Sequence, residues 1–83
     1  MYKPEDPAVF RDRFARGRRL LQQMGVRLLG SSERAEQAIR NCLRTASKNP
    51  PAFGTECAFY CWLVRILINE ALLIRRHERS RAA

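Results

Sequence analysis

Apolar residues in the first third of the chain recur four and seven positions apart, the spacing of one helical face: Phe10, Phe14, Leu21 and Leu28. Asp6 followed by Pro7 is a helix start, because the aspartate can cap the first amides and proline fits the first helical position. Gly30 can end the helix in the left-handed conformation. We therefore predict a helix over residues 7–29. Two glycines inside it mark sites for a kink or a close helix contact: Gly17 and Gly25.

A second amphipathic segment follows, and its apolar positions are again three and four residues apart: Ala35, Ala38, Ile39, Cys42, Leu43 and Ala46. Ser31 or Ser32 can cap its start. The spacing predicts a helix over residues 32–47. Residues 48–55 contain two prolines and a glycine, so we predict that this stretch is a loop.

The last third of the chain is long and apolar from residue 57 to residue 74. Thr55 can cap a helix there, and we predict one over residues 56–78 with a C-terminal tail that frays. The length raises the question of a membrane span, but polar residues in the middle would be costly in lipid: Arg65, Asn69 and Glu70. A central helix buried on most sides, without membrane insertion, fits better.

No segment shows the two-residue alternation of a β-strand, and 83 residues allow a single domain. The expected fold class is therefore all-α: a compact bundle of three main helices over about 7–29, 32–47 and 56–78, with residues 1–83 forming one domain.

The charge of the chain points to an anionic partner. Sixteen Lys and Arg residues stand against eight Asp and Glu, which gives a net charge of +8, and fourteen of the sixteen are arginines. Arginine pairs with phosphate through two hydrogen bonds and stacks on bases. Nucleic acid is the first expectation, and a membrane surface or an acidic protein is the second. A solvated basic surface with no such partner is the remaining alternative.

Cysteine usage and the scattered titratable residues argue against a metal site and against catalysis. Three cysteines cannot form a closed disulfide framework, so we expect buried free thiols in a reducing cytoplasm: Cys42, Cys57 and Cys61. His77 is the one histidine and has no nucleophile in a catalytic arrangement near it. We expect neither enzyme activity, nor a cofactor, nor a metal site. The first residues contain no apolar run that would indicate a signal peptide.

The run from Phe53 to Arg76 resembles region 2, the promoter-melting domain, of bacterial sigma factors of the extracytoplasmic-function class. In that family F-x-x-W-L-x-x-I-x-x-N is followed by a basic end, and the matching positions here are Phe59, Trp62, Leu63, Ile66 and Asn69. Upstream, residues 28–30 (L-L-G), a four-residue gap and residues 35–36 (A-E) also correspond. The resemblance extends from about Val9 to Arg79. The family's second helical domain, which reads the minus-thirty-five element, has no counterpart here.

The resemblance implies a transcription initiation module that binds RNA polymerase and promoter DNA. The second helix of such domains docks on the clamp helices of the largest polymerase subunit, and the corresponding residues here are Glu36, Gln37, Arg40, Asn41 and Arg44. The loop after that helix and a face of the third helix capture an unstacked base of the minus-ten element on the non-template strand. The corresponding residues are Lys48, Asn49, Tyr60, Arg65, Arg75 and Arg76.

Some of these residues have simpler interpretations. Phe59 and Trp62 lie on one apolar stripe and are expected in the core, whereas Tyr60 lies off that stripe and is the better candidate for stacking on a base. Arg75 and Arg76 could instead only stabilise a helix C-terminus.

The second helix departs from the family pattern A-E-D-x-x-Q-E-x-F-x-x-x-W. Acidic residues are lost at Gln37 and Asn41, Arg40 stands in place of a glutamine, and smaller residues replace aromatic ones at Leu43 and Ser47. A face that has lost acid and gained base supports an alternative function. In that alternative the chain is a helical interaction module that binds a regulator of the anti-sigma type, or a second copy of itself, rather than reading DNA.

Overall fold

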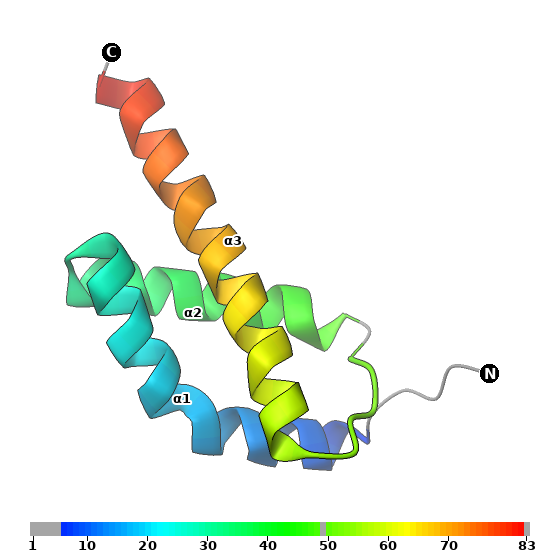
Figure 1. Ribbon diagram of the computed structural model, residues 1–83. Helices are drawn as coiled ribbons and strands as arrows, with labels where there is room; N and C mark the ends of the chain where they lie inside the picture. Colours follow the sequence, from blue (N-terminus) through cyan, green and yellow to red (C-terminus); the bar gives the residue numbers. More distant parts are fainter. Residues whose placement is uncertain (1–5, 49, 83) are drawn as a thin grey trace.

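A computed structural model describes residues 6–48 and 50–82 of the chain. Its first helix, α1, is Pro7–Leu29 (Figure 1). Asp6 caps its start, since its Oδ1 accepts hydrogen bonds from the amides of Ala8 and Val9 at 2.8 and 3.4 Å. At the other end Gly30 has a φ of 71°, and its N–H donates to the carbonyl of Val26 at 2.7 Å. Both predicted ends of this helix are confirmed.

Helix α2 is Ser32–Ser47, and helix α3 is Glu56–Ala82. The hydroxyl of Ser31 accepts from the amide of Arg34 at 3.3 Å, so Ser31 rather than Ser32 is the N-cap. The hydroxyl of Thr55 accepts from the amide of Ala58 at 3.1 Å and caps α3 as predicted.

Helix α3 continues beyond its predicted end at about residue 78, to Ala82. Two contacts from other parts of the chain hold this end of α3. Arg34 of α2 forms an ion pair with Glu78 at 2.6 Å, and Arg75 donates to the carbonyl of Leu28 at 3.4 Å. Arg75 therefore lies within the helix rather than at its C-terminus.

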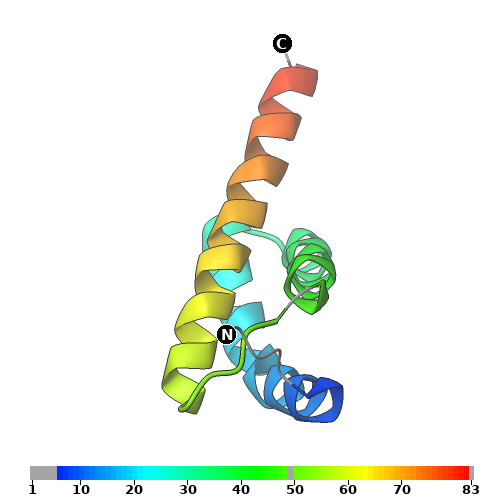
Figure 2. The same cartoon turned by 90° about the vertical axis from the view of Figure 1, so that its right-hand side faces the viewer.

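The three helices of the described residues form an all-α bundle, in which every helix packs against the other two. Figures 1 and 2 show that α1 and α2 are joined by a short turn, that α3 crosses them, and that the C-terminal part of α3 extends beyond both. Side chains from all three helices meet in the core, and the largest fully buried ones are Phe59, Leu21, Ile39, Leu63, Leu67 and Cys42.

Helix α3 is covered on one side only, contrary to the expectation of a helix buried on most sides. Its fully buried residues are four apart, at Phe59, Leu63, Leu67 and Ala71, whereas Leu72 and Leu73 are more than half exposed. Within its most apolar 18-residue window the mean hydropathy is 1.7 and only 22% of the residues are buried. By length and composition alone α3 could therefore cross a membrane, a test that core helices of soluble proteins also pass.

Both glycines singled out in α1 lie at close helix contacts. A Cβ atom on Gly17 would be 2.6 Å from Cε1 of Tyr60 on α3, and one on Gly25 would be 2.9 Å from Cβ of Ala35 on α2. The two glycines thus let α1 approach both of its neighbours.

Candidate nucleic-acid interface

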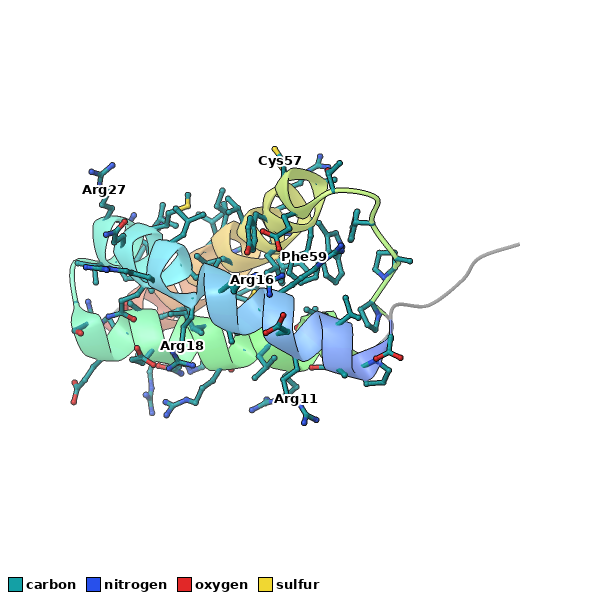
Figure 3. The ribbon with its side chains drawn as sticks, turned by 90° about the horizontal axis from the view of Figure 1, so that it is seen from below. Arg11, Arg16, Arg18, Arg27, Cys57 and Phe59 are labelled. Atoms are coloured by element: carbon teal, nitrogen blue, oxygen red, sulfur yellow. The ribbon has the colours of Figure 1, made fainter. Side chains whose placement is uncertain are left out.

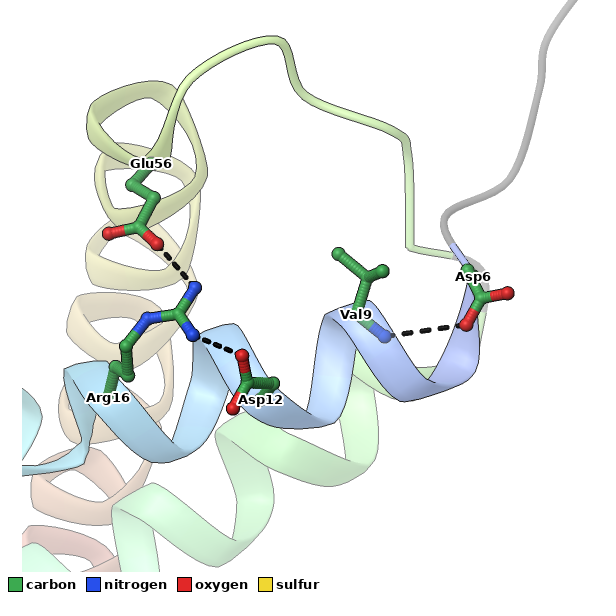
Figure 4. Close-up of polar contacts among 5 residues, drawn as sticks. All are labelled: Asp6, Val9, Asp12, Arg16 and Glu56. Atoms are coloured by element: carbon green, nitrogen blue, oxygen red, sulfur yellow. Dashed lines mark hydrogen bonds and ion pairs between the residues drawn. The ribbon is translucent and has the colours of Figure 1, made fainter.

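All three acidic residues of α3 are bonded to another helix of the bundle. Glu56 forms an ion pair with Arg16 of α1, which also binds Asp12 (Figure 4). Glu70 accepts a hydrogen bond from the hydroxyl of Thr45 at 3.2 Å, and Glu78 pairs with Arg34, both partners lying on α2. The two carboxylates beside Arg16 raise the pKa of its guanidinium, first through the hydrogen bond to Glu56 and then through that to Asp12.

The basic residues of α3 are all exposed: Arg65, Arg75, Arg76, Arg79 and Arg81. Since the acids of this helix are engaged with α1 and α2, its exposed surface has a strong excess of positive charge. An anionic polymer that lies along α3 would meet cations in the middle of the helix and at its projecting end. Four of them, Arg65, Arg75, Arg76 and Arg79, lie on one side of the helix at about 3.6 residues per turn, and we call these four the α3 arginine face.

The residues predicted to contact DNA do not all gather on this face. Arg65, Arg75 and Arg76 belong to it, whereas Lys48 follows α2 and lines a groove between α1 and α2. Asn49 lies outside the described residues. The predicted DNA-contacting set is therefore divided between two parts of the molecule.

Tyr60 is half-buried, because its ring edge fills the space that Gly17 leaves open. Its ring also meets Phe59 edge-on, with the centroids 5.8 Å apart. Tyr60, which we expected to lie off the core stripe, thus packs against the core with part of its ring. Phe59 is fully buried as predicted, and half-buried Trp62 packs on it and on Phe53, with centroids 5.9 and 5.4 Å apart.

Arg13 positions the loop that precedes α3, a role that its place among other arginines of α1 did not reveal. Its guanidinium donates to the carbonyl of Phe53 at 3.2 Å and lies 5.8 Å from the centroid of the Phe59 ring. Arg13 thus connects α1, the loop and α3. The half-buried environment that distinguishes it from exposed Arg11 and Arg16 arises only when the three segments come together.

The surface of α2 predicted to dock on polymerase is mainly basic and polar. Gln37, Arg40 and Arg44 are exposed and Asn41 is half-buried. Glu36, the one acid among the predicted residues, forms an ion pair with Arg18 of α1 at 2.7 Å. Its charge is therefore compensated within the bundle.

The three cysteines occupy two kinds of environment. Cys42 is fully buried, and burial raises the pKa of its thiol to about 11, with a smaller contribution from the carboxylate of Glu70. Cys57 and Cys61 are free and exposed, so the prediction of buried thiols is wrong for these two (Figure 3 shows Cys57 pointing away from the bundle). They lie on the side of α3 that neither neighbouring helix covers.

Among residues 6–48 and 50–82 no group of three or more His, Cys, Asp or Glu side chains is arranged to hold a metal ion. Comparison with known proteins found no family model, no curated protein and no solved structure that matches this chain.

Proposed function

We propose that the chain is a sigma region 2-like transcription initiation domain. In this proposal it binds RNA polymerase and the melted non-template strand of a minus-ten promoter element. The observation that supports DNA binding most directly is the separation of charge on α3, whose acids are bonded within the bundle and whose arginines are exposed. Single strands are bound by cations along the phosphates and by apolar or aromatic side chains against the bases.

The α3 arginine face supplies the first of these two elements. Arg65, Arg75 and Arg76 would contact phosphates, and Lys48 with Asn49 would approach the strand from the preceding loop. The loop also offers Phe53, half-buried against Trp62, while Tyr60 can present only the part of its ring that Gly17 does not cover. Polymerase would dock on the α2 surface formed by Glu36, Gln37, Arg40, Asn41 and Arg44.

Fluorescence anisotropy with a labelled minus-ten oligonucleotide tests this function. The single non-template strand should bind more tightly than the duplex of the same sequence, and purified core RNA polymerase should increase that preference. Equal affinity for strand and duplex, with no effect of polymerase, would contradict the proposal.

A second candidate function is supported by the charge of α2. Because Glu36 is paired with Arg18, the exposed charged side chains of the predicted docking surface are Arg40 and Arg44. A helical module that binds an acidic regulator would use such a surface. Gel filtration with purified core polymerase separates the two candidates: co-elution supports the sigma-like domain, and failure to co-elute at low salt supports the interaction module.

A further inference from the structure

A groove of about 750 Å³ lies between the first half of α1 and the end of α2. Its floor is formed mainly by apolar side chains, among them Phe14 and Ala15 of α1 and Leu43 of α2. Ser47 also lines it, and Lys48 lies where α2 ends. We call this cavity the α1–α2 groove. It is separate from the α3 arginine face, because no residue of α3 lines it.

The floor of the groove suits an inserted side chain better than a stacked base. The two phenyl rings in it, those of Phe10 and Phe14, are only 6% and 5% exposed, so neither offers a ring face to a base. The exposed apolar surface belongs instead to aliphatic groups, above all to Leu43, which is 38% exposed. Aliphatic and aromatic side chains of a protein segment could bury this surface.

Among the described residues, every charged one that lines the groove is basic: Arg11, Arg18 and Lys48. Arg18 already shares its charge with Glu36, whereas neither Arg11 nor Lys48 is paired with a described carboxylate. A ligand with carboxylates beside its apolar groups would therefore match the groove in both respects. A second copy of the chain fits poorly, because two molecules of net charge +8 repel each other.

The sequence of α2 leaves this space open. Leu43 and Ser47 are the residues of α2 that line the groove, and the side chain of Ser47 is small. A larger side chain at position 47 would occupy it from within.

From these features we propose that the α1–α2 groove binds a short, acidic, amphipathic segment of a partner protein. Apolar side chains of the segment pack on Ala15 and Leu43, and its carboxylates pair with Arg11 and Lys48. This mode of recognition is that of an amphipathic helix in a groove. The proposal does not depend on DNA binding, since Lys48 is the one groove residue that is also proposed to contact DNA.

The test uses two labelled helical peptides of about four turns. Both carry the same Leu and Trp residues on one face, and the remaining positions are Glu in one peptide and Lys in the other. Fluorescence anisotropy should show binding of the Glu peptide only. Ser47→Trp should fill the groove and weaken binding by roughly tenfold or more, whereas Ser80→Trp, the same change on exposed α3, should leave it unchanged.

Charge reversal provides the second arm of the test. Arg11→Glu should also weaken binding of the Glu peptide by roughly threefold or more, while Arg19→Glu, at an exposed position of α1 that does not line the groove, should have a small effect. The proposal is overturned if the two peptides bind with equal affinity. It is also overturned if the Ser47→Trp variant binds the Glu peptide with the same affinity as the unmodified chain. It is also overturned if Ser47→Trp weakens the binding of a single-stranded oligonucleotide but not the binding of the Glu peptide. Ser47→Trp and Arg11→Glu change no residue proposed to contact DNA and should retain the oligonucleotide affinity of the α3 arginine face, so the two proposals can fail separately.

Discussion

Gly25 of α1 and Ala35 of α2 pack so closely that a Cβ atom added to the glycine would lie 2.9 Å from the Cβ and 3.2 Å from the Cα of the alanine. The neighbour includes backbone, which cannot move aside as a flexible side chain can. The separation of α1 and α2 at this point is therefore set by the absence of a side chain at position 25.

Gly25→Ala should destabilise the protein although alanine is the better helix former. The helix propensity gain is about 1 kcal/mol, but overpacking a well-packed contact costs about 1–3 kcal/mol. We expect a net loss of about 1 kcal/mol in the free energy of unfolding, measured by urea denaturation followed by circular dichroism. Adding Ala35→Gly should recover part of the loss. A Gly25→Ala variant more stable than the unmodified chain would show that the helices separate freely here.

Gly17→Ala should have a smaller effect, because the atom it meets belongs to the side chain of Tyr60, which is half-buried. A double-mutant cycle with Tyr60→Leu isolates this contact. In the leucine background Gly17→Ala should be neutral or stabilising, since the tyrosine ring no longer occupies the space. A loss of stability that is the same in both backgrounds would mean that Tyr60 is not the obstacle.

Stability should fall at alkaline pH through Cys42. Burial raises the pKa of this thiol from 9.0 to about 11, so the folded state keeps it protonated at a pH where the unfolded chain ionises. The stabilising contribution is thus fully present below pH 9 and is lost as the pH rises through about 11. Between these values the free energy of unfolding should decrease by up to about 1.4 kcal/mol per pH unit.

Cys42→Ala is the control for that titration, because other groups also ionise in this range. The difference in free energy of unfolding between the unmodified chain and the variant should change with pH only above pH 9. Alkylation gives an independent check: iodoacetamide should modify exposed Cys57 and Cys61 in the folded protein, and Cys42 only after denaturant is added. A difference in free energy of unfolding that stays constant with pH, together with rapid alkylation of Cys42 in the folded protein, would show that the pKa of the Cys42 thiol is not raised.

The C-terminal part of α3 should loosen when Glu78 loses its charge. Arg34 and Glu78 are partly exposed, so Glu78→Gln should cost less than about 1 kcal/mol in global stability. Its effect should be local, with faster amide exchange in the last turns of α3 and little change in residues 59–71. High salt should reproduce the effect in the unmodified chain, and unchanged exchange in both experiments would show that the ion pair does not hold the helix end.

The helix starts and the end of α1 could be predicted from sequence because local contacts determine them. Asp6, Ser31 and Thr55 each accept a hydrogen bond from an amide two or three residues away, and Gly30 adopts its left-handed conformation without a distant partner. The end of α3 is different. Its last turns bond to Arg34 and to the carbonyl of Leu28, and neither partner is apparent from the residues of α3.

The candidate site was predictable only in part for the same reason. The excess of arginine is a property of composition, but the exposure of the basic charges on α3 depends on Glu56, Glu70 and Glu78 finding partners on other helices. Similarly, α3 is apolar around most of its circumference, so periodicity could not show that Cys57 and Cys61 remain outside the core.

The salt dependence of oligonucleotide binding tests the central claim, that the α3 arginine face binds a single strand. Affinity is measured at several salt concentrations for the unmodified chain and for Arg65→Gln with Arg75→Gln and Arg76→Gln. The matched control removes three arginines from α1 and α2: Arg19→Gln, Arg27→Gln and Arg44→Gln.

We predict that the α3 variant binds more weakly and that the magnitude of its slope of log affinity against log salt is smaller by about 2, as expected for three lost phosphate contacts. The control should keep the original slope. Equal slopes for the two variants would contradict the account, because they would show that the basic charge acts as a whole and that α3 has no special part in binding.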